Sequence, residues 1–264
     1  MNGNNFFIID VGNTDIVIAL IKDYQIYKIK RYKTIDFRNK KLLLFKKFTQ
    51  IKKILSKQNK INCIISSVVP EINYNLKKTC ISFLKENPHF VSFNKTKLNI
   101  KINLKNKNQV GADRIANTIA VKSLYKKAPT LVIDFGTTTT FDVIDNSSSY
   151  VGGLIAPGIN LSLQNLFNKT SKLPLVKFKK NDGIIGKNTR NAIQNGLYLG
   201  YIGLVTFIIK KIQTKFKKKL FCISTGGLSK IISKDIKLIN VVNENLTTHG
   251  LIEIFKLNYN EKFT

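Results

Sequence analysis

Two short polar turns in this chain could do chemistry, because each places a carboxylate, a glycine and threonine hydroxyls next to an apolar run. The first turn spans Asp10 to Thr14, and the second spans Asp134 to Thr138. Glycine leaves the backbone N–H groups of a turn open to an anion, and such groups form a concave donor site. The carboxylates of Asp10 and Asp134 would repel a bare phosphate, so we expect a cation between them and the phosphate. Two such turns in register therefore predict phosphate binding assisted by a metal ion.

The two turns also predict the fold, because an internal repeat indicates two related lobes. In the first half, the expected order of strand, strand, strand, helix, strand, helix, strand fits an actin-like lobe. We therefore predict an α/β fold of two duplicated actin-like (ribonuclease H-like) lobes, with mixed sheets flanked by helices and a cleft between them. The expected N-terminal lobe covers residues 1–112, and the expected C-terminal lobe covers residues 113–264. A helix over 110–125 would connect the lobes.

Hydrophobic spacing and turn residues set the other expected elements. Strands are expected over 16–21, 25–33, 61–66, 89–93, 220–224 and 239–242, and helices around 42–55, from Pro70, over 161–166, from Thr189, near Leu228 and over 251–255. Residues 152–158 are rich in Gly and Pro and predict a loop. Thr189 is expected to cap the helix that it begins. The apolar stretch 196–209 is shorter than a membrane span needs, so it predicts a buried or interface helix.

The strongly basic composition has two interpretations. The formal net charge is +29, and only Arg31, Arg38, Arg114 and Arg190 are arginine among 44 basic residues. A nucleic-acid or membrane patch would use this charge to contact phosphates. Proteins that recognise nucleic-acid bases favour arginine, however, and the lysines here are spread along the whole chain. We therefore favour compositional drift and expect neither a nucleic-acid nor a membrane partner.

The three cysteines indicate a reducing compartment. Cys63, Cys80 and Cys222 are odd in number and form no Cys-x-x-Cys pair. Buried free thiols in the cytoplasm are the simplest interpretation. The apolar run before Asp10 is too short for a secretory signal, which agrees with that interpretation.

Glycine turns follow three expected strands, and this set resembles the actin-like ATPase superfamily, which includes sugar and acetate kinases. The motif Gly111-Ala112-Asp113-Arg114 makes the resemblance specific, because the chain then resembles the type III pantothenate kinases. The matching motifs follow one order along the chain: Asp10 to Thr14, Gly111 to Arg114, Asp134 to Thr137, Gly152-Gly153 with Pro157-Gly158, Gly186 to Thr189, Thr225 to Gly227, and Leu246-Thr247 with Gly250-Leu251.

The resemblance implies transfer of the γ-phosphate of ATP to pantothenate, giving 4′-phosphopantothenate in the first step of coenzyme A biosynthesis. By matching motif, Asp113 would accept the proton of the primary hydroxyl, and the residues that hold pantothenate would be Gly111, Ala112, Asp113, Arg114 and Thr189. A carboxylate of ordinary pKa suffices, because positioning dominates phosphoryl transfer. The planar fork of Arg114 suits the pantothenate carboxylate. The structural alternatives are a buried Asp–Arg pair at a helix start and, for Thr189, a helix cap.

The same resemblance assigns the nucleotide and ion contacts, with the ATP cleft between the lobes. The ATP-binding residues would be Asp10, Val11, Gly12, Asn13, Thr14, Asp15, Ile16, Val17 and Thr137. Asp10 would help organise Mg²⁺ with ATP, and Asp134 would bind a monovalent cation, K⁺ or NH₄⁺. The family also implies a homodimer with the pantothenate pocket near the subunit interface. The apolar helix after Thr189 would suit that interface.

The chain departs from the family pattern at three positions. Leu104 stands where many relatives have an aromatic residue in the wall of the pantothenate pocket, Lys107 replaces a proline, and Asp15 stands where a smaller neutral residue is common. Two alternative functions stay open: a non-catalytic transcription accessory factor of the same fold, and a kinase for another small hydroxyl compound. The presence of both Asp113 and Asp134 favours the enzyme, since a pure binder does not need both.

Overall fold

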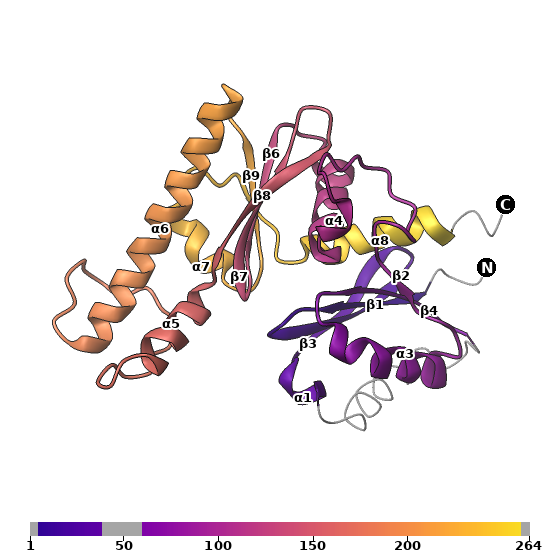
Figure 1. The fold of residues 1–264 in the computed structure, drawn as a ribbon, viewed down its shortest axis with the longest axis horizontal. Coiled ribbons are helices and arrows are strands. Elements are labelled where there is room, and N and C mark those ends of the chain that lie inside the picture. The colour runs from indigo at the N-terminus through magenta and orange to yellow at the C-terminus, as the bar shows by residue number, and fades with distance from the viewer. Residues whose placement is uncertain (1–4, 39–59, 260–264) are drawn as a thin grey trace. The chain divides into compact units, whose positions relative to one another are not determined.

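The computed structural model describes residues 5–38 and 60–259, and within them the chain forms two compact units (Figure 1). Unit 1 comprises residues 1–99, 105–124 and 246–264, and unit 2 comprises residues 100–104 and 125–245. Each unit is built on a five-stranded sheet. The helix expected around 42–55 lies outside the described residues.

The two sheets share one topology, which confirms the duplicated α/β fold. Their strand orders are β3-β2-β1-β4-β5 in unit 1 and β10-β9-β6-β7-β8 in unit 2. In each sheet the first three strands along the chain pair antiparallel, and the last two add in parallel. The strands are β1 (Phe6–Val11), β2 (Asp15–Lys22), β3 (Gln25–Lys33), β4 (Asn62–Ser67), β5 (His89–Phe90), β6 (Thr130–Phe135), β7 (Thr138–Ile144), β8 (Tyr150–Pro157), β9 (Phe221–Thr225) and β10 (Val241–Val242).

Helices and short helical segments complete the two units. In unit 1 they are α1 (Ile35–Arg38), α3 (Pro70–Leu84), η2 (Lys107–Gln109), α4 (Ala112–Ala120) and α8 (Leu246–Tyr259). The π-helical segment η3 (Val121–Tyr125) directly follows α4. The helix expected over 110–125 therefore begins at Ala112 and changes from α-helical to π-helical geometry after Ala120. In unit 2 they are α5 (Ile159–Asn168), α6 (Thr189–Phe216), α7 (Ser229–Ile232) and η4 (Ser233–Asp235).

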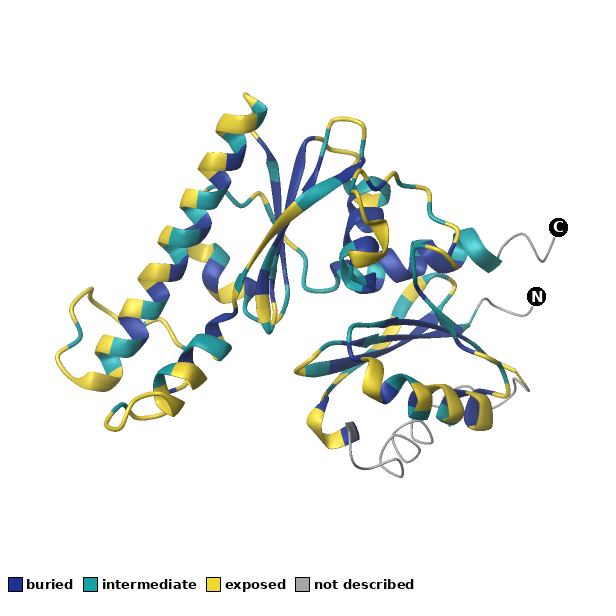
Figure 2. Cartoon of the chain, viewed as in Figure 1, coloured by how far each residue is buried: buried dark blue, intermediate teal, exposed yellow. Residues whose placement is uncertain are grey.

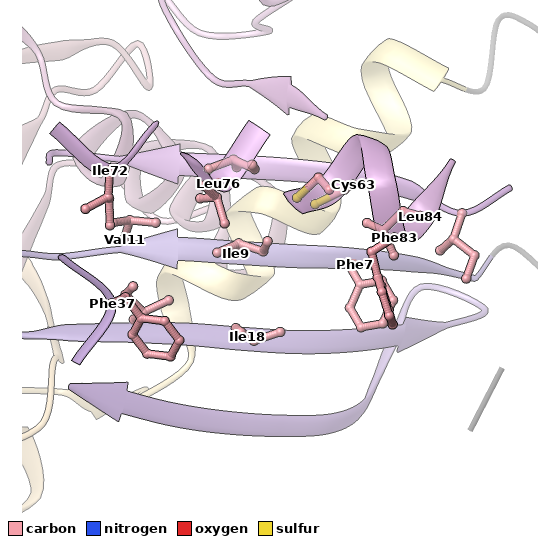
Figure 3. Close-up of a cluster of buried hydrophobic side chains, with 14 of the residues drawn as sticks. Phe7, Ile9, Val11, Ile18, Phe37, Cys63, Ile72, Leu76, Phe83 and Leu84 are labelled. Carbon is pink, nitrogen blue, oxygen red and sulfur yellow. The ribbon is translucent and has the colours of Figure 1, made fainter. Parts of the chain in front are cut away.

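The central strand of unit 1 is apolar on both faces, because helices cover both. Ile9 and Val11 of β1 belong to the same buried cluster as Ile72 and Leu76 of α3 (Figure 3). The neighbouring residue Phe6 faces the other way and stacks on Phe255 of α8, with ring centroids 3.6 Å apart. Alternate residues of a strand point to opposite faces, so a nearly continuous apolar run is what such a strand needs. This packing fixes the end of β1, where the first polar turn begins.

The division of the chain differs from the expected boundary at residue 112, because α4 packs with the C-terminal helix in unit 1. Gly250 of α8 lies so close to α4 that a Cβ there would be 2.9 Å from the Cα of Ala116. The Thr247 hydroxyl donates to Asn117 Oδ1 at 2.9 Å. Glycine thus permits a close helix crossing. The sequence motif that contains Gly250 therefore packs, through α8, against the helix that the Gly111 to Arg114 motif begins.

The 152–158 segment is a strand and not the expected loop. Residues Tyr150–Pro157 form β8, which pairs antiparallel with β7. Its glycines accommodate the pairing, since Gly152 has a φ of +122° beside an irregularity in the register. The Pro157 carbonyl accepts a hydrogen bond from the Tyr201 hydroxyl of α6. The Gly- and Pro-rich composition indicated a loop, because composition alone does not reveal that this segment pairs with β7.

The longest helix, α6, has 28 residues and extends beyond the apolar stretch 196–209 in both directions. The apolar stretch 196–209 alone is shorter than a membrane span needs, but the helix that contains it is not. Among the residues that the structure describes, it is the one helix that is long and apolar enough to cross a membrane, by length and composition only. One side of α6 is buried in the core of unit 2, and the other is exposed (Figure 2). A core helix of a soluble protein can be equally long and apolar.

Asn188, and not Thr189, caps α6. The Asn191 N–H donates to Asn188 Oδ1 at 2.9 Å, and Thr189 is the first residue of the helix. We expect Asn188→Ala to lower the free energy of unfolding by about 1 kcal/mol. Asn188→Ser should restore most of the loss, and Thr189→Ala should leave stability unchanged. Urea unfolding of the three variants measures this, and a larger loss in Thr189→Ala than in Asn188→Ala would contradict the assignment.

Candidate active site

The first polar turn connects β1 to β2 at the edge of the unit 1 sheet. The Gly12 N–H donates to the Asp15 carbonyl at 2.9 Å, and the Thr34 hydroxyl donates to the Gly12 carbonyl at 2.6 Å. A Cβ on Gly12 would lie 3.1 Å from that Asp15 carbonyl oxygen, which is tight. Asn13 and Thr14 are exposed at the tip of the turn. Hydrogen bonds to Asp15 and Thr34 therefore hold the base of the turn in place, while its exposed tip can reach a ligand.

Unit 1 brings Asp10 close to Asp113. Burial, together with the nearby charge of Asp113, raises the pKa of Asp10 to about 7. Arg31 on β3 lowers this pKa in part. The Ser66 hydroxyl, opposite Asp10 in the β1–β4 ladder, acts in the same direction, although among the described residues its geometry falls short of a hydrogen bond. A buried carboxyl group whose ionisation is disfavoured by a neighbouring carboxylate predicts a site for a cation or a shared proton.

Asp113 is the second residue of α4. Burial raises the pKa of its carboxyl group, while the Arg114 N–H, which donates to Asp113 Oδ1 at 2.8 Å, and the Arg114 charge act in the opposite direction. Gly111 precedes the helix, and its carbonyl accepts from the Ile115 N–H at 3.1 Å. The helix N-terminus favours a negative charge at this place. The sequence folds so that Asp113 is anchored by backbone and only partly exposed.

A pocket lies beside the N-terminus of α4. It has a volume of about 450 Å³ and is lined by residues 67–68, 91–95 and 108–112, all in unit 1. Val68, Val91, Phe93 and Val110 make much of the wall apolar. The backbone of Gly111 and Ala112, which precedes Asp113, forms part of the same wall. The volume lies in the range of small-molecule sites, about 300–1,000 Å³.

The second polar turn lies in unit 2 against two further glycine positions. A Cβ on Gly226, which has a φ of +87°, would lie 2.7 Å from the Phe135 carbonyl oxygen and would overlap Asp134 Oδ1. A Cβ on Gly158 would lie 2.7 Å from the Gly136 carbonyl oxygen. At Gly136 itself a Cβ would meet only ordinary contacts, the nearest at 3.5 Å. The local backbone therefore requires glycine at positions 158 and 226, beside this turn, but leaves room for a side chain at Gly136 within the turn.

The predicted site residues form two groups. Unit 1 holds the whole first turn, from Asp10 to Val17, together with Gly111 to Arg114. Unit 2 holds Asp134 and Thr137, with Gly226 of the third glycine turn beside Asp134. Thr189 is exposed at the start of α6.

Three departures from the family pattern acquire a structural context. Asp15 Oδ1 accepts from Lys33 Nζ at 2.7 Å, so its extra negative charge is paired. Leu104 lies in unit 2, where a Cβ on Gly152 would contact it at 3.6 Å, and it does not line the unit 1 pocket. Lys107 Nζ lies 5.5 Å from the ring centroid of Phe93, which does line the pocket.

Sequence reasoning missed the 91–95 segment as part of a site. These residues follow β5, which is only His89–Phe90 and not the expected 89–93. The one available signal was the change from apolar to polar residues after Val91, which is a common sign of a loop. The pairing of β5 with β4 brings the segment to the pocket.

Both expected ions fit the donors present, although in different degrees. Mg²⁺ binds through one or two carboxylates and substrate phosphates, and Asp10, on which the charge of Asp113 acts, offers such oxygens. Among residues 5–38 and 60–259 there is no cluster of three or more His, Cys, Asp and Glu side chains that would hold a metal alone. Asp134 offers one carboxylate next to the Phe135 carbonyl. Oxygen donors of this kind suit a hard cation.

Two sheets of identical topology, each with an Asp-x-Gly-x-Thr turn after its first strand, define an actin-like α/β fold. The solved structures with this fold include a protein of Campylobacter jejuni described as a Baf family transcriptional activator, with a TM-score of 0.60 and 19% identity over 97% of this chain and 100% of that chain. The ethanolamine utilization protein EutJ from Carboxydothermus hydrogenoformans has a TM-score of 0.54 and 12% identity over 94% of this chain and 89% of that chain. These likenesses show the fold alone.

The chain belongs to the type III pantothenate kinase family. That family matches residues 6–211. The type III pantothenate kinase of Sulfurihydrogenibium sp. (strain YO3AOP1) is 40% identical over 245 residues, which cover 92% of this chain and 96% of the relative. The resemblance inferred from the motifs is thereby confirmed, and the chain is a member of an enzyme family.

Proposed function

We propose that this chain transfers the γ-phosphoryl group of ATP to the primary hydroxyl of pantothenate. The observation that carries the proposal is the pocket in unit 1, whose wall contains Gly111 and Ala112 directly before Asp113. Asp10 of the first phosphate turn is near enough to Asp113 for the charge of Asp113 to raise the pKa of Asp10. A hydroxyl compound in this pocket would thus lie beside both a base and a phosphate turn.

The chemistry needs few protein groups. The hydroxyl oxygen of pantothenate attacks the γ-phosphorus, the bond from this phosphorus to the bridging oxygen of ADP breaks, and Asp113 accepts the hydroxyl proton. The raised pKa of Asp113 makes its carboxylate a better proton acceptor than an ordinary aspartate. Asp10 would hold Mg²⁺ with the phosphates, and Asp134 would hold K⁺ or NH₄⁺; these ions supply positive charge that stabilises the transferring phosphoryl group. By matching motif, Thr137 contacts ATP.

The test is ADP release coupled to a spectroscopic signal. The wild-type chain should release ADP with ATP, Mg²⁺, K⁺ and pantothenate, and should release little when pantothenate, Mg²⁺ or K⁺ is omitted. Replacing pantothenate with sugars or other small hydroxyl compounds should give only background. An equal rate with several acceptors would favour a different small-molecule kinase, and no rate with any acceptor would favour a binding protein of the same fold.

The exposed side of α6 supports a homodimer. Phe207 is 60% exposed and Leu199 is 44% exposed on this helix. Large apolar side chains exposed along one helix suit an interaction surface if they form a contiguous patch with their neighbours. We expect the chain to sediment as a dimer and Phe207→Glu to sediment as a monomer at the same concentration. A wild-type monomer at micromolar concentration, or a dimer that Phe207→Glu leaves intact, would contradict this assignment.

A further inference from the structure

The pocket beside α4 carries one charged side chain among the described residues that line it, and that side chain is Lys95. The rest of the wall is apolar, amide, hydroxyl or backbone, and it includes Phe93, Asn94 and Gln109. Among the described residues, Lys95 makes no hydrogen bond or ion pair. A single positive charge at the rim of a mostly uncharged pocket favours a ligand with a single negative charge.

Pantothenate has that charge pattern, with a reacting hydroxyl at one end and a carboxylate at the other. The hydroxyl end belongs beside Asp113, and Gly111 and Ala112 form the adjoining wall. The carboxylate must then be bound elsewhere in the pocket. The apolar wall made by Val68, Phe93 and Val110 suits the dimethyl carbon that follows the hydroxyl end.

The charge of Arg114 lowers the pKa of Asp113, so Arg114 belongs with the end of the substrate that carries the reacting hydroxyl. Asp113 and Arg114 are consecutive residues of α4, so their side chains leave the helix about 100° apart. Residues 108–112 line the pocket, whereas Asp113 and Arg114 follow them on α4 and do not line it themselves. The sequence alone favoured Arg114 for its fork of donors, without knowledge of the 91–95 segment.

We propose that Lys95 binds the carboxylate of pantothenate and selects for acidic substrates. This inference rests on the proposed function and adds a specificity-determining residue to it. Phe93 lies two residues before Lys95, and Lys107 Nζ lies 5.5 Å from its ring centroid, a cation–π distance. Phe93 also supplies the aromatic wall that Leu104, which lies in unit 2, does not.

The experiment compares two substrates that differ only at this end. Pantothenol has a hydroxymethyl group where pantothenate has its carboxylate. We expect Lys95→Ala to lower kcat/KM for pantothenate about tenfold, the low end for a hydrogen bond to a charged group because Lys95 is exposed. The loss should appear in KM, and kcat/KM for pantothenol should stay unchanged. Lys95→Arg should retain the preference for pantothenate.

Lys97→Ala is the matched control. Lys97 is exposed two residues away, carries the same charge and does not line the pocket. It should leave both substrates unchanged, which separates a specific contact from the general attraction of a basic protein. The inference fails if the wild type is active and Lys95→Ala lowers both substrates equally or lowers neither. A wild type that phosphorylates neither compound would instead overturn the proposed function, and the inference with it.

Discussion

Asp113→Asn should lower kcat for pantothenate phosphorylation by about 10²–10⁴-fold, the usual contribution of a general base. Asparagine keeps the shape of the side chain, and its Oδ1 can still accept the Arg114 N–H, but it cannot take the proton of the hydroxyl. The effect should fall on kcat, because the pocket wall at Gly111 and Ala112 is unchanged. Steady-state ADP release at saturating pantothenate measures it.

The control for this variant is its stability. Burial raises the pKa of Asp113, so the ionised carboxylate does not stabilise the folded chain, and its removal should leave the unfolding temperature unchanged or higher. A folded Asp113→Asn chain with nearly wild-type turnover would show that Asp113 is not the base. An unfolded variant would point to the alternative, a structural Asp–Arg pair.

Asp10→Asn should stabilise the nucleotide-free chain at pH 8 while abolishing most activity. The pKa of Asp10 is about 7 when folded, against 3.8 when unfolded. Between these values the folded state binds more protons than the unfolded state, so this group's contribution to stability is lost as pH rises from about 4 to 7. The full shift corresponds to an upper limit of about 4 kcal/mol, since one pKa unit is ~1.4 kcal/mol. Asparagine avoids that cost because it has no charge.

The measurement is thermal unfolding of wild type and Asp10→Asn from pH 5 to pH 8, without nucleotide or magnesium. The gap in unfolding temperature should favour the variant already at pH 5, should grow as the pH rises to about 7, and should change little above that. Asp15→Asn is the control, because the Asp15 carboxylate is exposed and pairs with Lys33, and it should show no such growth. A gap that does not change with pH would contradict the buried, charge-repelled carboxylate.

The repeat predicted the fold because the strand and turn pattern is local. Phe6 to Val11 and Thr130 to Phe135 are apolar runs ending at a polar turn, and both are first strands of identical sheets. The division that the structure shows, with residues 105–124 and 246–264 in unit 1, could not be found in this way. It depends on Gly250 meeting Ala116, residues far apart in sequence, and no local pattern reveals such a crossing.

The candidate site was predictable where a motif carries its own chemistry. Asp10 could be named from its turn and Asp113 from the motif that carries the family resemblance, and in unit 1 the charge of Asp113 acts on Asp10. Lys95 could not, because one lysine among 44 basic residues has no signal in the sequence. Its place follows from the parallel pairing of β4 and β5, which only the folded structure defines. The cap of α6 was missed by one residue for a related reason: Asn188 and Thr189 are both good caps, and backbone geometry selects between them.

The most direct test of the account is identification of the product formed from ATP and pantothenate by the purified chain. Mass spectrometry and ³¹P NMR should find pantothenate carrying one phosphoryl group on its primary hydroxyl, in an amount equal to the ADP released, with Asp113→Asn forming at most about a hundredth as much per unit time. ADP released without phosphorylated pantothenate, or product formed equally fast by Asp113→Asn, would contradict the account.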